Sequence, residues 1–228
     1  MHDDAPLWAD QAFLRNVQYV TDRNLAARQA IYAFQRPKLD LPAAVLGSLA
    51  LSGTEVIADI GCGNGAYLAE LHRRGHLGQV IGLDASPGML GAAAPRCPGA
   101  ALVNGDAMEL PLADSAADVT LAMHMLYHVP DPAAAVAELK RVTAPGGRTV
   151  IALNGDDHQR ELRAVIGDVA GAMASSDPGW DRIRLDEGEA HAAGMFGSVI
   201  RHDFAGQLEI PDPGPVADYV RSMSLVKS

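Results

Sequence analysis

The chain has 228 residues, of which 48% are hydrophobic and 20% are charged, and its formal net charge is −10. This length suits one domain with a large core, with or without an appendage. The acidic balance argues against a nucleic-acid-binding surface, which needs clustered Lys and Arg, and against an anionic membrane partner. The chain start lacks the pattern of a signal peptide, and the longest uncharged apolar stretch, residues 41–54, is too short to cross a bilayer. Because the two cysteines, Cys62 and Cys97, suit a reducing compartment, we expect a cytoplasmic protein.

Two helices are predicted in the first 36 residues, one from Trp8 to Tyr19 and one from a cap at Thr21 to Phe34. A third runs from Pro42 to Leu51. The first two contain more than a third of the aromatic residues of the chain: Trp8, Phe13, Tyr19, Tyr32 and Phe34. These side chains either pack the segment on the body of the protein or form a lid over a small-molecule pocket. We therefore divide the chain into a helical arm, residues 1–40, and a main domain, residues 41–228.

A strand, a glycine loop and a helix are predicted over residues 56–72. The strand, Val56–Ile60, is apolar except for Asp59, and Gly61, Gly63 and Gly65 follow it. Such a loop lets a ligand approach the backbone and the free N–H groups of the helix N-terminus. Its pattern, D-x-G-x-G-x-G, is one residue shorter than the dinucleotide fingerprint, and a carboxylate at Asp59 suits an ammonium group better than a phosphate. The pattern favours a ligand with a cationic amino-acid tail and a ribose; the alternative is a purely structural turn.

Two further acids follow the next two predicted strands. Asp84 ends the strand Val80–Asp84, 19 residues after Gly65, where a βαβ unit places the carboxylate that binds ribose hydroxyls. Ser86 and Pro87 supply the cap and first turn of the next helix. Asp106 follows the short strand Ala101–Val103, where it either faces a ligand or makes an Asx-turn.

A fourth strand, Asp118–Ala122, runs into Met123 and His124, and a helix and a turn at residues 144–147 lead to a fifth strand, Arg148–Leu153. All the candidate ligand-binding residues at strand ends thus lie at carboxyl ends, where open α/β sheets bind ligands.

The C-terminal part is predicted to hold helices at Asp156–Ala174, at Leu185–Met195 and after the Pro211–Pro215 cluster, with a loop at Ser175–Gly179. A β-hairpin is predicted to pair Ser198–Phe204 with Gln207–Ile210.

Motifs along the chain resemble those of class I S-adenosylmethionine-dependent methyltransferases, in the small-molecule group that includes quinone-biosynthesis and natural-product enzymes. The resembling segments are residues 56–65, 82–90, 105–112, 126–132 and 139–147, in the family's order and at similar spacings. The resemblance covers about residues 54–153. The arm matches only in layout, as the variable lid of such enzymes, and the region after residue 156 matches loosely.

This resemblance implies a Rossmann-like, doubly wound α/β fold, with a mostly parallel seven-stranded sheet, a C-terminal antiparallel hairpin and an N-terminal helical lid. It implies S-adenosylmethionine as the cofactor and a small-molecule methyl acceptor, in secondary metabolism or quinone-type biosynthesis. No nucleic acid or membrane is expected as partner, and the protein is expected to be a monomer or homodimer. Because the chain ends soon after its last helix, we expect no substrate-closing tail.

Site roles follow from the resemblance by position. Asp59 and the glycine-loop backbone would hold the methionine moiety, Asp84 the ribose, and Asp106 the adenine amino group. The expected cofactor contacts are Tyr19, Asp59, Gly61, Cys62, Gly63, Gly65, Asp84, Ala85, Met89, Asp106, Ala107, Met108 and Met123.

His124 and His128 are the candidate catalytic residues. His124 lies just beyond the fourth strand, beside the expected methyl position, and the two histidines share a face if the segment is helical. Either could serve as general base for an acceptor that must lose a proton. The alternatives are a pocket-lining role for His124, a hydrogen bond from His128 to the turn before Pro130, and a metal pair. No third ligand is evident, so we expect no metal.

Three other functions compete with methyl transfer to a small neutral or cationic acceptor. An NAD-type oxidoreductase could use the same half-fold, but the shortened glycine spacing disfavours it. A regulatory protein could keep the cofactor site and lack turnover. RNA modification is weakened by the net charge of −10.

Overall fold

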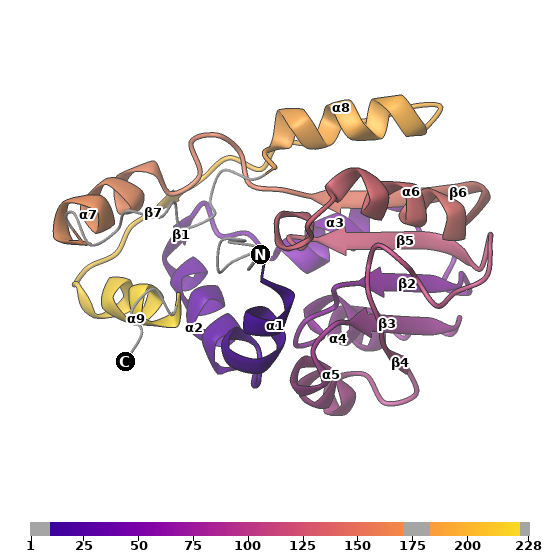
Figure 1. Cartoon of the computed structure of the whole chain (residues 1–228), viewed down its shortest axis with the longest axis horizontal. Helices are drawn as coiled ribbons and strands as arrows, with labels where there is room; N and C mark the ends of the chain where they lie inside the picture. Colours follow the sequence, from indigo (N-terminus) through magenta and orange to yellow (C-terminus); the bar gives the residue numbers. More distant parts are fainter. Residues whose placement is uncertain (1–9, 171–182, 224–228) are drawn as a thin grey trace, which may run out of the picture.

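The computed structural model describes residues 10–170 and 183–223, with residues 166–170 described by their backbone alone. A parallel sheet of five strands lies at its centre, in the order β4-β3-β2-β5-β6 (Figure 1). The strands are β2 (Ile57–Ile60), β3 (Val80–Asp84), β4 (Ala101–Asn104), β5 (Ala117–Met123) and β6 (Thr143–Ala152). Every residue of β2 is buried, as expected for a strand covered on both faces. The chain order reverses at β2, so the carboxyl ends of β2 and β5 flank the point where doubly wound sheets bind ligands.

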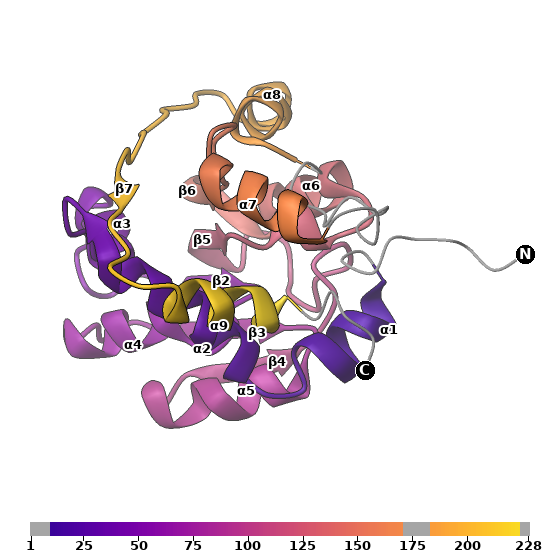
Figure 2. The same ribbon diagram turned by 90° about the vertical axis from the view of Figure 1, so that its left-hand side faces the viewer.

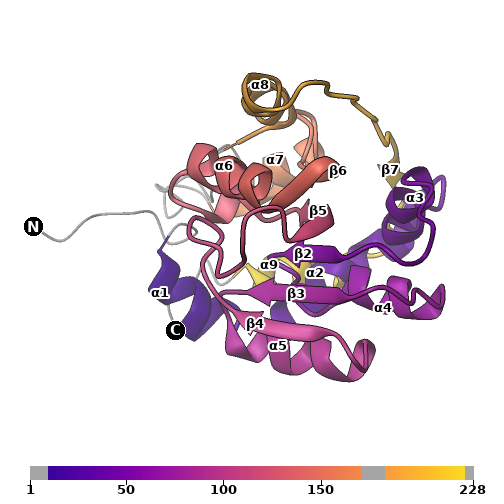
Figure 3. The same cartoon turned by 90° about the vertical axis from the view of Figure 1, so that its right-hand side faces the viewer.

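Helices cover both faces of this sheet (Figure 3). One face packs on α3 (Leu41–Ser48), α4 (Ala66–Arg73) and α5 (Pro87–Ala93). The other packs on α6 (Pro132–Val142), with α8 (Leu185–Met195) lying against α6. The doubly wound α/β fold expected from the sequence is therefore confirmed.

Capping residues set the starts of three of these helices. The side chains of Asp40, Ser86 and Asp131 accept hydrogen bonds from backbone N–H groups in the first turns of α3, α5 and α6, and a proline stands in each first turn. The helix N-cap predicted at Ser86 is thus confirmed, and it fixes where α5 begins beside the carboxyl end of β3.

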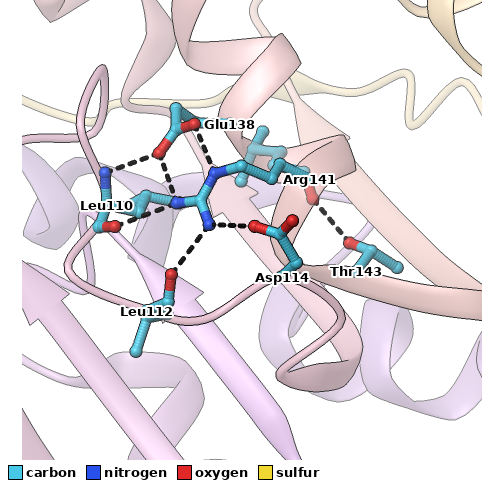
Figure 4. A network of polar contacts seen from close by, with 7 residues as sticks. Leu110, Leu112, Asp114, Glu138, Arg141 and Thr143 are labelled. Atoms are coloured by element: carbon cyan, nitrogen blue, oxygen red, sulfur yellow. Dashed lines mark hydrogen bonds and ion pairs between the residues drawn. The ribbon is translucent and has the colours of Figure 1, made fainter.

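An arginine network holds the loop between β4 and β5 against α6 (Figure 4). Arg141 donates to the carboxylates of Glu138 and Asp114 and to the carbonyls of Leu110 and Leu112. Glu138 in turn accepts from the Leu110 N–H at 2.7 Å. Because this loop starts at Gly105 and Asp106, the network anchors the third acidic strand end.

The N-terminal arm and the C-terminal segment pack together beside the sheet (Figures 1 and 2). The arm comprises α1 (Gln11–Phe13), a π-helix (Leu14–Gln18), α2 (Arg23–Ala30), a 3₁₀-helix (Ile31–Phe34) and β1 (Gln35–Arg36). β1 pairs antiparallel with β7 (Gln207–Leu208), and α2 packs on α9 (Gly214–Ser222). The Gln18 amide also donates to the Ser222 carbonyl at 2.9 Å. We call residues 11–36 and 207–223 together the cap.

Two sheet predictions are wrong. The described part of the chain has five strands in the main sheet rather than seven, and residues 198–204 pair with no strand there. Residues 207–208 pair instead with β1, and the Glu209 N–H donates to the Phe34 carbonyl at 3.0 Å. The hairpin fails because the arm supplies the backbone partner that the local turn was expected to provide.

Element boundaries shift in three other places. The first helix starts at Gln11, and its predicted start at Trp8 lies outside the described residues. α7 spans Arg160–Ala170, and the predicted continuation to residue 174 and the loop at 175–179 also lie outside them. The turn predicted at residues 144–147 lies within β6, where Gly146 has φ +78°. Among the described residues, no helix is both long and apolar enough to cross a membrane.

Candidate active site

The glycine loop at the end of β2 requires glycine at each of its three positions. Gly61, Gly63 and Gly65 have φ angles of +69°, +54° and +79°, a region that other L-residues rarely adopt. The N–H groups of Gly61 and Cys62 both donate to the Leu83 carbonyl, at 2.7 and 2.9 Å. The loop is therefore tied to the end of β3, and Gly61, Cys62 and Gly63 line the cleft described below.

Asp59 presents an unpaired carboxylate at the base of this loop. It is 1% exposed, and neither of its oxygens has a hydrogen-bond partner. Burial, and secondly the charge of Asp84, raise its pKa from 3.8 to about 7. The Tyr67 hydroxyl is likewise buried without a partner and lies close enough to sense the Asp59 charge. A buried polar group in this state calls for a ligand, and two acceptor oxygens suit a cationic amino group.

Asp84 links the glycine loop, α5 and the arm. Its carboxylate accepts from the N–H groups of Gly63 and Ser86, each at 2.8 Å. Burial raises its pKa, although these two backbone hydrogen bonds act in the opposite direction. The Ser86 hydroxyl then donates to the Tyr19 carbonyl at 2.6 Å, which joins this strand end to the arm.

Asp106 makes the Asx-turn that the sequence allowed. Its Oδ1 accepts from the Met108 N–H at 2.8 Å, and the side chain is exposed. The neighbouring Ala107 is 8% exposed, whereas Met108 packs against the hydrophobic core under α6. Ala107 belongs to the same core, but it and Asp106 also line the cleft described below, whereas Met108 does not.

His124 and His128 face different parts of the molecule. His124 has φ +55°, so it does not continue a helix, and a short 3₁₀-helix begins only at Leu126. Burial lowers the pKa of His124, and His158 lies near enough for the two rings to interact electrostatically. The two histidines would share a face only if the segment were helical, and this condition is not met because the backbone turns at His124. A non-glycine residue at positive φ next to a strand end is typical of functional sites.

His128 belongs to an aromatic group that includes the arm. Its Nε2 lies 2.9 Å from the Tyr19 hydroxyl, and its ring meets those of Tyr19 and Tyr127 edge to face. Its backbone N–H bonds the Met125 carbonyl within the turn. The imidazole thus contacts the arm through the Tyr19 hydroxyl.

One large cleft joins most of the predicted site residues. Its volume is about 2850 Å³, well above the ~300–1,000 Å³ of common ligand pockets, so it has room for two ligands. The predicted residues that line it are Tyr19, Asp59, Gly61, Cys62, Gly63, Asp84, Ala85, Met89, Asp106, Ala107, Met123, His124 and His128. Gly65 and Met108 do not line it: Gly65 packs against Ala93, and Met108 lies against the core. Within the described ranges, no group of His, Cys, Asp and Glu could hold a metal ion.

Sequence reasoning missed Arg28, Gln29 and His158, which also line this cleft. Asn64 of the glycine loop donates to the Gln29 side chain at 3.0 Å, and Arg28 donates to the Tyr19 hydroxyl at 2.8 Å. His158 hydrogen-bonds Tyr32 at 3.3 Å, and burial, then His124 and Arg163, lower its pKa to about 4. The one available signal was the aromatic content of the arm, which pointed to the segment but not to Arg28 or His158.

Comparisons with known proteins agree on one family. A family model described as a methyltransferase domain matches residues 58–151. An uncharacterized methyltransferase of Mycobacterium tuberculosis is 31% identical over 185 residues, which are 79% of this chain and 70% of the relative. A demethylmenaquinone methyltransferase of Beutenbergia cavernae is 37% identical over 109 residues, 48% of this chain and 45% of that protein.

Solved structures share the fold. A SAM-dependent methyltransferase of Thermotoga maritima, described as a possible histamine N-methyltransferase, aligns with a TM-score of 0.57 at 20% identity. The alignment covers 83% of this chain and 80% of that chain. At this identity the likeness concerns the fold alone.

Proposed function

The chain belongs to the class I S-adenosylmethionine-dependent methyltransferases, and on that premise we propose that its cleft methylates a small molecule at an O, N or C atom. The observation that carries the proposal is the unpaired Asp59 carboxylate beneath the glycine loop. When bound, S-adenosylmethionine supplies a methyl group on a sulfonium. The acceptor belongs to secondary metabolism or quinone-type biosynthesis; the similarity to a demethylmenaquinone methyltransferase supports the second.

The residues of the cleft fit this cofactor. Asp59 and the bare backbone of Gly61 and Gly63 would hold its amino-acid portion, since the buried carboxylate lacks a cation. Asp84 would accept the ribose hydroxyls while its present bonds to Gly63 and Ser86 keep the loop in place. Ala85, Met89, Asp106 and Ala107 would enclose the adenine, and Met123 would line the methionine side.

Catalysis by this site would rest first on alignment of the two reactants in the cleft. We assign His124 as general base for an acceptor that must lose a proton, because it stands at the end of β5 in the cleft. Burial lowers its pKa, so at neutral pH its imidazole is neutral and able to accept a proton. His128, bonded to Tyr19, would position the arm.

The cap would cover the acceptor and exclude water from it. Tyr19, Tyr32 and Arg28 of the arm, together with Tyr219 of α9, line the same cleft as the strand ends. This retains the predicted lid at residues 1–40 and adds the C-terminal segment to it.

Calorimetry with S-adenosylhomocysteine and NAD tests the cofactor assignment. We expect micromolar binding of S-adenosylhomocysteine, no measurable binding of NAD, and loss of S-adenosylhomocysteine binding in Asp59→Ala. Tight NAD binding would favour the oxidoreductase. Transfer of label from methyl-labelled S-adenosylmethionine to a metabolite extract then separates an enzyme from a regulatory protein, for which no label would move.

A further inference from the structure

Arg28 is a half-buried cation in the wall of the cleft. It lies on α2, near the glycine loop, since the adjacent Gln29 accepts a hydrogen bond from Asn64. One guanidinium nitrogen donates to the Tyr19 hydroxyl at 2.8 Å, and the guanidinium carbon lies 5.2 Å from the centre of the Tyr19 ring. A guanidinium has five N–H donors in a fixed fork, so this contact uses only a small part of its capacity.

Among the described side chains, those of residues 10–165 and 183–223, no carboxylate pairs with Arg28. Other arginines there do form ion pairs, among them Arg74 with Glu70, Arg141 with Glu138 and Arg201 with Asp186. The titratable groups near Arg28 are instead the phenols of Tyr19, Tyr127 and Tyr219, which carry no charge at neutral pH. Arginine stays protonated in proteins, and a charge withdrawn from water is normally paired. The unmatched fork therefore calls for an anion in the cleft.

The residues around Arg28 indicate the chemical character of the uncharged part of that anion. The rings of Tyr127 and His128 contact each other edge to face. Burial raises the pKa of the nearby Tyr32 phenol, and the charge of Arg28 acts in the opposite direction. Flat aromatic walls of this kind suit an aromatic or otherwise apolar body. Asp59 and Asp84 lie in the same cleft, and their charges would oppose a dianionic phosphate more than a single carboxylate.

We propose that the methyl acceptor carries a carboxylate, which binds the guanidinium fork of Arg28, on an aromatic or apolar body held between the tyrosines. This rests on the proposed function, because it names the substrate class of that same cleft. It replaces the neutral or cationic acceptor of the sequence-based hypothesis, since the charge nearest the acceptor decides recognition. Arg28 is thus a specificity-determining residue.

Matched acids and amides test the proposal in the presence of saturating S-adenosylhomocysteine. The probes are 4-hydroxybenzoate, 4-hydroxyphenylacetate and 4-hydroxycinnamate, each against its primary amide, measured by calorimetry. We expect at least one acid to bind about 10- to 100-fold tighter than its amide, the scale of charge-assisted hydrogen bonds. Arg28→Met should abolish this preference, and Arg28→Lys should keep part of it, because lysine retains the charge without the fork. The control Arg23→Gln, an exposed residue of the same helix, should keep it in full.

Three results would overturn the proposal: amides binding as well as acids, a preference that survives Arg28→Met, or no acid binding tighter than about 1 mM. Binding of S-adenosylhomocysteine to each variant shows that the fold and the cofactor site are intact. If the wild type itself fails to bind S-adenosylhomocysteine, the proposed function fails; if only the acid preference is missing, this inference alone fails.

Discussion

The strand ends and the cap line the same cleft but are built in different ways. Asp59, Asp84 and Asp106 lie in or just after neighbouring parallel strands. Backbone hydrogen bonds hold the carboxylates of Asp84 and Asp106, and Asp59 is placed by its position in β2. The cap joins segments that are far apart in the chain, as in the bond between Gln18 and Ser222, 204 residues away. The carboxyl ends of the strands are therefore suited to a ligand that is constant in the family, the cofactor. The cap is suited to a ligand that varies, the acceptor. Substitutions at the two places should separate cofactor binding from acceptor turnover.

Asp84→Ala should give the largest effect and should act on the cofactor. A carboxylate that binds ribose hydroxyls makes charge-assisted hydrogen bonds of about 1.5–3 kcal/mol each, and the substitution also frees the N–H groups of Gly63 and Ser86. We expect about 100-fold or more loss of S-adenosylhomocysteine affinity by calorimetry. Asp84→Asn, which keeps the shape, should lose less. A loss below about threefold for Asp84→Ala would remove Asp84 from the cofactor site.

Substitution of His124 should lower turnover and leave cofactor binding intact. A general base contributes about 10²-fold or more, so His124→Ala should lose that much in kcat. His124→Asn is a necessary companion, because asparagine tolerates the φ of +55° better than alanine and so separates loss of the base from loss of the turn.

His128→Ala is the matched comparison for His124. It removes the bond to Tyr19 and should raise the KM for the acceptor more than it lowers kcat. Labelled methyl transfer provides the measurement. Near-normal turnover in both His124 variants would show that His124 is not a general base and that alignment of the reactants accounts for catalysis.

The carboxyl ends of the strands could be predicted well, because the sequence patterns that mark them are local. Buried strands appear as apolar runs, glycines at positive φ cannot be replaced cheaply, and Ser86 followed by Pro87 marks a helix start. The same local patterns placed Asp59, Asp84 and His124 at strand ends, where the structure has them.

The cap escaped prediction because its partners are distant in the chain. Residues 198–204 were predicted to pair with residues 207–210, yet residues 207–208 pair with β1 instead. Arg28 looks like an ordinary helix-surface residue until α2 is placed against the strand ends, and no periodicity reports such a contact. Spacing alone also left open whether the segment from His124 to His128 is helical, because it does not reveal a turn at positive φ.

Asp59→Asn should change the pH dependence of stability in the ligand-free protein. The wild-type carboxyl has a pKa of about 7 in the fold against 3.8 normally, so the folded state binds the extra proton. The stability associated with the protonated carboxyl is therefore fully present below pH 3.8, and it is lost as the pH rises to about 7. Asp59→Asn lacks this loss, so its stability relative to wild type should rise by about 2–3 kcal/mol between pH 5 and pH 7.5.

Urea unfolding at the two pH values measures this difference. Asp157→Asn, at an exposed carboxylate that pairs with Arg160, serves as control and should leave the pH profile unchanged. The same Asp59→Asn protein should fail to bind S-adenosylhomocysteine, so that stability is gained where function is lost. Parallel pH profiles for wild type and Asp59→Asn would contradict the unpaired state of Asp59.

Gly88, in the first turn of α5, lies tightly against the backbone of the arm. A Cβ atom at Gly88 would collide with the Val20 carbonyl and come within 3.2 Å of the Tyr19 carbonyl, the group that accepts the Ser86 hydroxyl. Gly91, on the same helix α5, has open space where its Cβ would lie. The two positions form a matched pair, since both exchange a helical glycine for alanine.

Gly88→Ala should therefore displace the arm, whereas Gly91→Ala should not. Gly91→Ala should be neutral or stabilising by about 0.5–1 kcal/mol, because alanine favours the helix. Gly88→Ala gains the same propensity but pays about 1–3 kcal/mol of overpacking against backbone that cannot rotate away. Displacement of Tyr19 moves the side of the cleft that would hold the acceptor, so kcat should fall by up to about 10-fold. The affinity for S-adenosylhomocysteine should change less. Thermal unfolding, calorimetry and labelled methyl transfer on both variants measure the three quantities. Equal stability and turnover in the pair would show that the arm does not rest on α5 during turnover, and the cap would then no longer define the acceptor site.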